Sequence, residues 1–167
     1  MAMSPDITDE LAGIAAGSAL GELRRQRPAV ADHIQGSYDA LLAPSDPGGL
    51  SLADRELIAL RTATLIGSTP LIKHHGARLR ELGAGDNEIE AAARFPDTPD
   101  LTPRQTAILG HVDMMTREPR TATRAATDAL LAHGLGPREI VTLAQLVAFV
   151  NFQARLLAGL RLLGEAS

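Results

Sequence analysis

The stretch that decides the fold covers residues 50–83 and reads LSLADRELIALRTATLIGSTPLIKHHGARLRELG. Ser51 is followed three residues later by Asp54, the spacing of a capping box at a helix start. Thr69 followed by Pro70 marks a second start, because threonine is a favoured N-cap and proline is favoured at the first helical position. The stretch therefore predicts two consecutive helices joined by a short turn, over 52–66 and 70–83.

The rest of the chain has the same helical character. Alanine, leucine, arginine and glutamate dominate, and no β-branched or aromatic alternation suggests a strand. Turn-rich segments at 43–50 and 95–101 are too short to separate independent domains. We therefore expect an all-α protein of about seven or eight helices. The remaining predicted helices lie near 6–18, 28–43, 86–94, 103–117, 120–133 and 137–163.

An internal repeat relates the two halves of the chain at a shift of 51 residues. The phrase GAGDNEI, which contains Glu88, falls on GLGPREI, which contains Glu139. In each phrase a helix ends at a glycine and the next helix begins soon after it. We therefore expect two helical hairpins with equivalent turns, packed against each other.

The repeat also separates residues that serve the fold from residues that could serve function. Glu56 falls on Ala107, and the histidine pair His74-His75 falls on two alanines. These polar groups are present only in the first unit, which is the pattern expected of a functional site added to a duplicated framework.

Composition excludes several classes of protein. The 167-residue chain has a net charge of −4 and no basic face for nucleic acid. We see no run of 18 apolar residues for a membrane span and no signal peptide at the start, so a cytoplasmic protein is expected. The absence of cysteine excludes disulfides, iron–sulfur clusters and thiol catalysis in this chain.

The two histidines have different expected environments. On a helix from Pro70, His75 lies four residues from both Leu71 and Leu79, on the apolar stripe, whereas His74 is rotated away by about 100°. No His-x3-His pattern is present, so we expect neither a metal nor any other cofactor. A buried His75 needs a partner, and Glu56 on the preceding helix is the nearest acid. The pair is either a satisfied core contact or an acid–base site.

Residues 50–83 resemble the core of the carboxymuconolactone decarboxylase family, in particular its alkylhydroperoxidase-D-like branch. That branch has a Glu in an Arg-Glu-Leu phrase, then a Cys-x-x-Cys, then a His-His pair; here Glu56 and His74-His75 stand at the matching places. The last helix, LAQLVAFVNFQARLLAGL, is similar too, including Asn151 and Arg155. The resemblance implies an alkylhydroperoxidase-D-like helical domain over 27–167, preceded by an N-terminal helical extension over 1–26.

The resemblance also shows where this chain departs from its family. Redox-active members reduce hydroperoxides through the cysteine pair, with the Glu and His relaying a proton. Here Ser68 and Leu71 stand at the cysteine places. Without a thiolate and a second thiol there is no peroxidatic attack and no disulfide to store electrons. Thiol peroxidase activity is therefore excluded, whatever the family membership suggests.

Three functions remain open. The first is a protein that binds a small ligand or a partner, such as a cysteine-bearing paralogue, with Ser68, Leu71 and His74 lining the vacated site. The second is a cysteine-independent enzyme that uses Glu56 and His75 as acid and base on a small carboxylated or peroxide-derived substrate. The third is a purely structural homo-oligomer.

The C-terminal helix suggests self-association. Asn151 and Arg155 lie four residues apart in an apolar helix, and we expect them to form a structural polar pair with a backbone turn or a neighbouring subunit. The segment IVTLAQLVAFV is apolar on nearly all sides, which is typical of a helix at the centre of a domain or in a subunit interface. Family and sequence together predict a dimer, trimer or hexamer.

Overall fold

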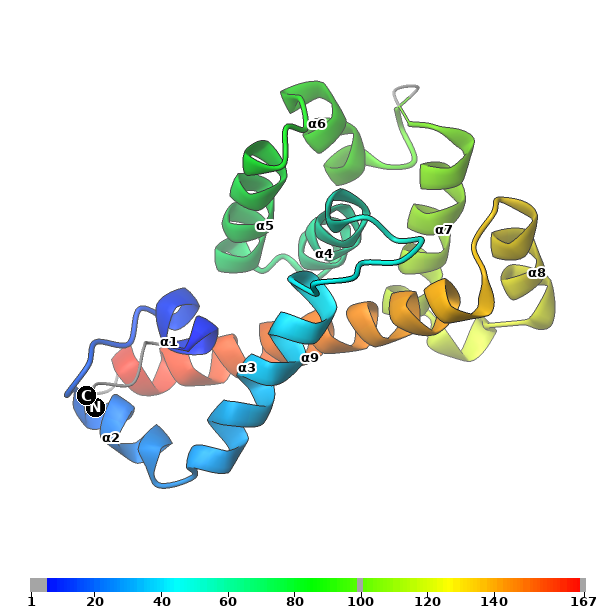
Figure 1. Ribbon diagram of the computed structural model, residues 1–167. Helices are drawn as coiled ribbons and strands as arrows, with labels where there is room; N and C mark the ends of the chain where they lie inside the picture. Colours follow the sequence, from blue (N-terminus) through cyan, green and yellow to red (C-terminus); the bar gives the residue numbers. More distant parts are fainter. Residues whose placement is uncertain (1–5, 99–100, 166–167) are drawn as a thin grey trace.

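The computed structural model describes residues 6–98 and 101–165, and this part of the chain is built from helices without strands (Figure 1). It holds nine α-helices and one short 3-10 helix, Pro119–Thr121. The all-α prediction is confirmed. The α-helices are α1 (Ile7–Ala12), α2 (Ala19–Arg25), α3 (Pro28–Leu42), α4 (Leu52–Ile66), α5 (Thr69–Glu81), α6 (Asp86–Arg94), α7 (Pro103–Arg117), α8 (Arg124–Ala132) and α9 (Pro137–Glu165).

The strongest sequence signals placed helix boundaries correctly. The predicted spans 52–66, 86–94 and 103–117 coincide with α4, α6 and α7. Ser51 and Thr102 each form a complete capping box. The side chain of the cap residue accepts from the backbone N–H of the third helical residue, and the side chain of that residue accepts from the backbone N–H of the cap. Explicit cap residues therefore fix these starts.

Two predicted helices were wrong in extent. The helix expected over 6–18 ends early, because Gly13 adopts the left-handed conformation (φ 68°), and α2, which was not predicted, begins after its N-cap Ser18. The helix expected over 120–133 begins at Arg124, since Thr123 caps it and the preceding residues form the 3-10 turn. At α5 the N-cap is Ser68, one residue before the expected Thr69.

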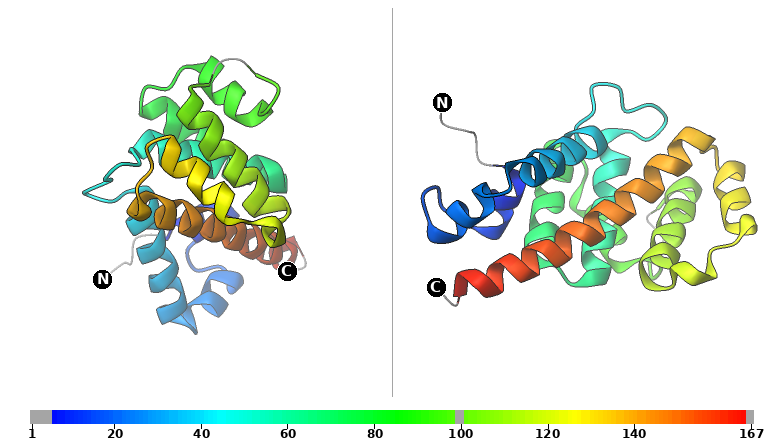
Figure 2. Two further views of the ribbon diagram at one scale, coloured as in Figure 1. Left: turned by 90° about the vertical axis from the view of Figure 1, so that its right-hand side faces the viewer. Right: turned by 90° about the horizontal axis from the view of Figure 1, so that it is seen from below.

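The core is organised around α4. Residues 55–63 of this helix are all buried, since α5, α6, α7 and α9 pack against it on several sides. α9 is the long helix that runs the length of the molecule (Figure 2). α1 and α2 pack against α3 and against the C-terminal part of the molecule formed by α9 (Figure 1). The hairpin of α4 and α5 therefore holds the candidate site inside the core.

The predicted duplication is visible in the helix boundaries. Shifted by 51 residues, α4 coincides with α7 at both ends, and α6 begins where α9 begins. We call α4–α6 the first unit and α7–α9 the second unit. They are joined across the core by Arg61, whose guanidinium forms two 2.7 Å bonds with Asp113 of α7 and one with the carbonyl of Ala93.

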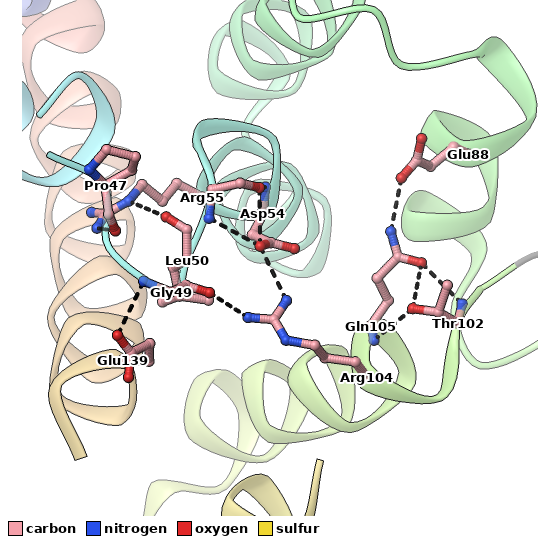
Figure 3. Close-up of polar contacts among 11 residues, drawn as sticks. Pro47, Gly49, Leu50, Asp54, Arg55, Glu88, Thr102, Arg104, Gln105 and Glu139 are labelled. Carbon is pink, nitrogen blue, oxygen red and sulfur yellow. Dashed lines mark hydrogen bonds and ion pairs between the residues drawn. The ribbon is translucent and has the colours of Figure 1, made fainter. Parts of the chain in front are cut away.

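The glutamates of the repeated phrases make reciprocal contacts between the units (Figure 3). Glu88 of α6 accepts a hydrogen bond from Gln105, the residue that completes the capping box of α7. Glu139 of α9 accepts one from the backbone N–H of Gly49, just before α4. Arg104 of α7 adds a 2.6 Å bond to the Gly49 carbonyl. Each unit therefore supports the start of the other unit's first helix.

Among residues 6–98 and 101–165, one helix, α9, is long and apolar enough to span a membrane, which the sequence had not suggested. Core helices of folded domains share these properties, and 44% of the apolar window of α9 is buried within the protein.

Candidate functional site

The turn between α4 and α5 brings the two candidate helices together. Gly67 ends α4 in the left-handed conformation (φ 75°), which a side chain at this position would strain. Ser68 then begins α5 without a side-chain capping bond, and Pro70 lies in the first turn. Because the connection is this short, the helices fold back on each other and their inner faces meet.

Glu56 and His75 meet at the centre of this hairpin, as the sequence predicted. His75 Nδ1 and Glu56 Oε2 lie 2.7 Å apart, and the two side chains are 0% and 1% exposed. A carboxylate on Nδ1 orients the ring and leaves Nε2 free to accept or donate a proton. The arrangement is that of a carboxylate-oriented imidazole buried in the protein.

The outer atoms of the pair are unsatisfied. Within the described residues, His75 Nε2 and Glu56 Oε1 are buried and have no hydrogen-bond partner. The nearest cation is Arg78, whose Nε lies 3.7 Å from Glu56 Oε1. A buried polar atom left without a hydrogen bond costs about 1–3 kcal/mol, so the position of Nε2 calls for a functional or structural reason.

The two positions that the resemblance assigned to cysteines have different environments. Leu71 is fully buried and belongs to the hydrophobic core. Ser68 is half-buried at the N-terminus of α5. Leu71 therefore contributes to packing, and Ser68 is the polar group of the two that solvent can reach.

His74 has a partner that the sequence did not indicate. Its Nε2 lies 2.8 Å from the hydroxyl of Tyr38 on α3, and its ring meets the His75 ring edge-on at 5.0 Å between centroids. Burial, and then the neighbouring His75 and Arg78, lower the pKa of His74 to about 4. Burial, and then the carboxylate of Glu56, raise the pKa of Tyr38 to about 12. At neutral pH both groups are therefore uncharged.

Tyr38 also lines a pocket between α1, α2 and α3. The pocket has a volume of about 720 Å³ and lies outside the α4–α5 hairpin: Glu56, Ser68, Leu71 and His75 are not among its lining residues. Its apolar walls come from Ile7, Ile14, Ala16, Pro28, Ala31 and the Tyr38 ring.

Asn151 and Arg155 bond within their own helix. Arg155 donates to the side-chain and backbone oxygens of Asn151, at 3.0 and 2.8 Å. Asn151 in turn donates to the carbonyl of Val147. We expected partners in a backbone turn or a neighbouring subunit; the two residues instead bond each other and α9 itself, because four residues along a helix place the side chains on one face.

No group of three or more histidine, aspartate or glutamate side chains positioned to hold a metal ion occurs among residues 6–98 and 101–165. The His75–Glu56 pair offers two ligands, whereas a zinc site needs three or four from the protein.

The fold and the site together define a class: duplicated all-helical proteins with a carboxylate–histidine pair buried between the first two helices of the first unit. The model of the carboxymuconolactone decarboxylase family matches residues 28–114 of this chain. The chain belongs to that family. The match begins at the start of α3, so α1 and α2 lie outside it. Among curated proteins, none matches.

Solved structures support the same fold. A peroxidase-related protein from Ralstonia eutropha JMP134, described as an alkylhydroperoxidase AhpD core, is 25% identical with a TM-score of 0.72, over 78% of this chain and 68% of that one. A peroxidase-related protein from Silicibacter sp. TM1040 is 24% identical with a TM-score of 0.73, over 79% of this chain and 68% of that one. A protein of unknown function from Agrobacterium tumefaciens is 26% identical with a TM-score of 0.65, over 84% of this chain and 88% of that one.

Proposed function

We propose that this protein is a small-ligand-binding member of its family that carries out no thiol redox chemistry. The chain has no cysteine, so it supplies neither a peroxidatic thiolate nor a disulfide. Leu71 fills its position in the core with an apolar side chain. What the chain offers a ligand is therefore shape and polar contacts rather than electrons.

The pocket between α1, α2 and α3 is the observation that carries this proposal. Its volume of about 720 Å³ falls within the range of small-molecule sites, and most of its wall area is apolar, although charged side chains also line it. Tyr38 lines the pocket and is hydrogen-bonded to His74, whose ring contacts His75. A ligand in the pocket would thus lie two side chains away from the buried Glu56–His75 pair.

A direct test follows Tyr38, the only tyrosine in a chain without tryptophan. We expect 1-octanol, a neutral apolar probe, to change tyrosine fluorescence saturably, with one site by calorimetry. Ala31→Phe places a ring in the pocket and is expected to weaken binding by about tenfold or more, since an occupied cavity excludes the ligand.

Ala129→Phe is the matched control, because Ala129 is exposed on α8 and outside the pocket. It should bind octanol like the wild type. The proposal would be rejected if Ala31→Phe bound octanol as tightly as the wild type, or if the wild type bound neither octanol nor its charged eight-carbon analogues.

A second candidate function is acid–base catalysis by His75 and Glu56 on a small carboxylated or peroxide-derived substrate. The unpartnered Nε2 of His75 favours it, since an imidazole oriented by a carboxylate is a competent general base. The ring is fully buried, so a substrate reaches it only when the surrounding helices move apart. Turnover that survives His75→Ala unchanged would exclude this role.

Self-association is part of the proposal. α9 exposes Val141, Phe152 and Leu162, which recur on one side of the helix, and the Phe152 side chain is 46% exposed. A second copy of the chain would cover them, as a dimer, trimer or hexamer in the cytoplasm; a cysteine-bearing paralogue is the alternative partner. Sedimentation that shows only a monomer would contradict the homo-oligomer.

A further inference from the structure

The charged groups around the pocket between α1, α2 and α3 are unevenly paired. Arg24 of α2 lies against two carboxylates of the α1 region, Asp6 at 3.0 Å and Asp9. Its side chain is largely buried, at 12% exposed, so the guanidinium is held by these acids rather than offered to a ligand. A ligand anion at this place would have to displace a carboxylate.

The second arginine of the pocket is also engaged. Arg25 donates to Glu22, three residues earlier on α2, at 2.6 Å. Glu22 does not itself line the pocket, but it lowers the free positive charge that Arg25 contributes. Both cations of the pocket thus have a carboxylate partner.

Two acids of the pocket have no such partner. Glu10 of α1 and Asp32 of α3 line it, are exposed, and form no ion pair with the described residues. With Asp6 and Asp9 the lining carries four carboxylates against two guanidiniums. The unpaired charge of the pocket is therefore negative.

The wall at Tyr38 has the same sign. Apart from burial, the carboxylates of Glu56, Glu10 and Asp39 raise the pKa of Tyr38, against one opposing cation, Arg78. The tyrosine ring thus lies in a field that favours positive charge, and its π-face attracts cations directly.

We infer that the pocket binds an amphipathic amine: an apolar body against Ile7, Ile14 and Pro28, with an ammonium group at the carboxylates of Glu10 and Asp32. This inference rests on the proposed ligand-binding function and adds the chemical class of the ligand. Apolar burial supplies the affinity, while the two carboxylates select for charge, because exposed ion pairs contribute modestly and add to discrimination.

The test compares three probes with one chain length: octylammonium, 1-octanol and octanoate. Calorimetry and Tyr38 fluorescence at low ionic strength measure their affinities for the full chain. We expect octylammonium to bind about fivefold to tenfold more tightly than octanol, and octanoate more weakly than octanol. Raising salt from about 20 mM to about 500 mM should reduce the spread among the probes, since exposed charges are screened.

Substitution locates the selectivity. The double variant Glu10→Gln with Asp32→Asn keeps size and polarity, and we expect it to lose the preference for octylammonium while its octanol affinity stays within about twofold. Asp128→Asn, an exposed helix aspartate outside the pocket, is the matched control and should keep the preference.

The outcomes separate the two claims. Three outcomes would overturn the amine inference and leave the ligand-binding function standing. In the first, octanol binds and the protein shows no preference among the probes; in the second, octanoate binds most tightly. In the third, the preference for octylammonium survives both the double variant and high salt. Failure of octanol and both charged probes to bind the wild type overturns the ligand-binding function itself.

Discussion

The two repeat units share a framework and differ in what they bury. α4 and α7 have equivalent bounds, both begin with a capping box, and both are followed by a glutamate that contacts the opposite unit. At the centre of its hairpin the first unit buries Glu56 and His75, whereas the second has Ala107 and Ala126 at the equivalent positions.

This difference shows that the second unit forms its helices without a buried polar pair between them. The second unit has the equivalent helices α7 and α8, of which α8 is shorter than α5, with two half-buried alanines at those positions. A buried ion-pair geometry is often no more stable than well-packed apolar residues. The helical framework shared by the two units therefore does not account for the presence of Glu56 and His75 in the first unit.

The largest expected effect comes from making the first unit like the second. Glu56→Ala or His75→Ala alone should each lower the free energy of unfolding by about 3 kcal/mol, because each leaves a buried polar partner unpaired. The double variant should lose clearly less free energy of unfolding than the sum of the two single variants, because no buried polar group is left without its partner. Urea denaturation of the four proteins in a double-mutant cycle measures this coupling.

The exposed pair Glu90 and Arg94 on α6 provides the control cycle. Its coupling should not exceed about 0.5 kcal/mol, as for other solvent-exposed pairs four residues apart in a helix. Additive losses at Glu56 and His75 would mean that the two groups do not act as a pair.

An intermediate effect is expected at the reciprocal glutamates. Glu139 accepts from two backbone N–H groups, those of Gly49 and Gly136, whereas Glu88 accepts from one side chain, Gln105. Glu139→Ala should lower Tm by about 2–4 °C and Glu88→Ala by less, because the former leaves two backbone donors unpaired. Scanning calorimetry of both variants checks the order; a larger loss at Glu88 would refute it.

The smallest expected effect is the pH dependence contributed by His74, which the second unit lacks because Ala125 stands there. The pKa of His74 falls from 6.5 to about 4 on folding, so the unfolded chain takes up a proton first as pH drops. Stability is then present above pH 6.5 and lost toward pH 4. After allowance for its partial exposure, the loss stays below about 1 kcal/mol.

Comparison with His74→Gln tests this assignment. The variant should lose less stability than the wild type between neutral and acid pH in urea denaturation, whereas His33→Gln, at an exposed site, should behave like the wild type. Parallel pH profiles for all three proteins would remove His74 as the cause.

Sequence reasoning succeeded where the signal was local. Ser51 with Asp54 marked α4, and helical spacing placed His75 on the buried stripe facing Glu56. It failed where no local signal exists. Tyr38 and His74 are 36 residues apart on different helices, and no spacing in the sequence indicates that these helices touch. Only tertiary packing brings the two side chains together. The pocket likewise depends on α2. This helix has only seven residues and follows two glycines, so its sequence gives too weak a helical pattern to predict it.

The reciprocal contacts of Glu88 and Glu139 have a consequence for how the chain can be divided. A cut in the link between α6 and α7 would yield two fragments, each lacking the partner for its own helix start and for the Arg61–Asp113 bridge. Such fragments would be poorly folded alone and complementary when mixed. The duplicated architecture thus makes this protein a candidate for fragment complementation, with recovery of helical signal on mixing as its readout.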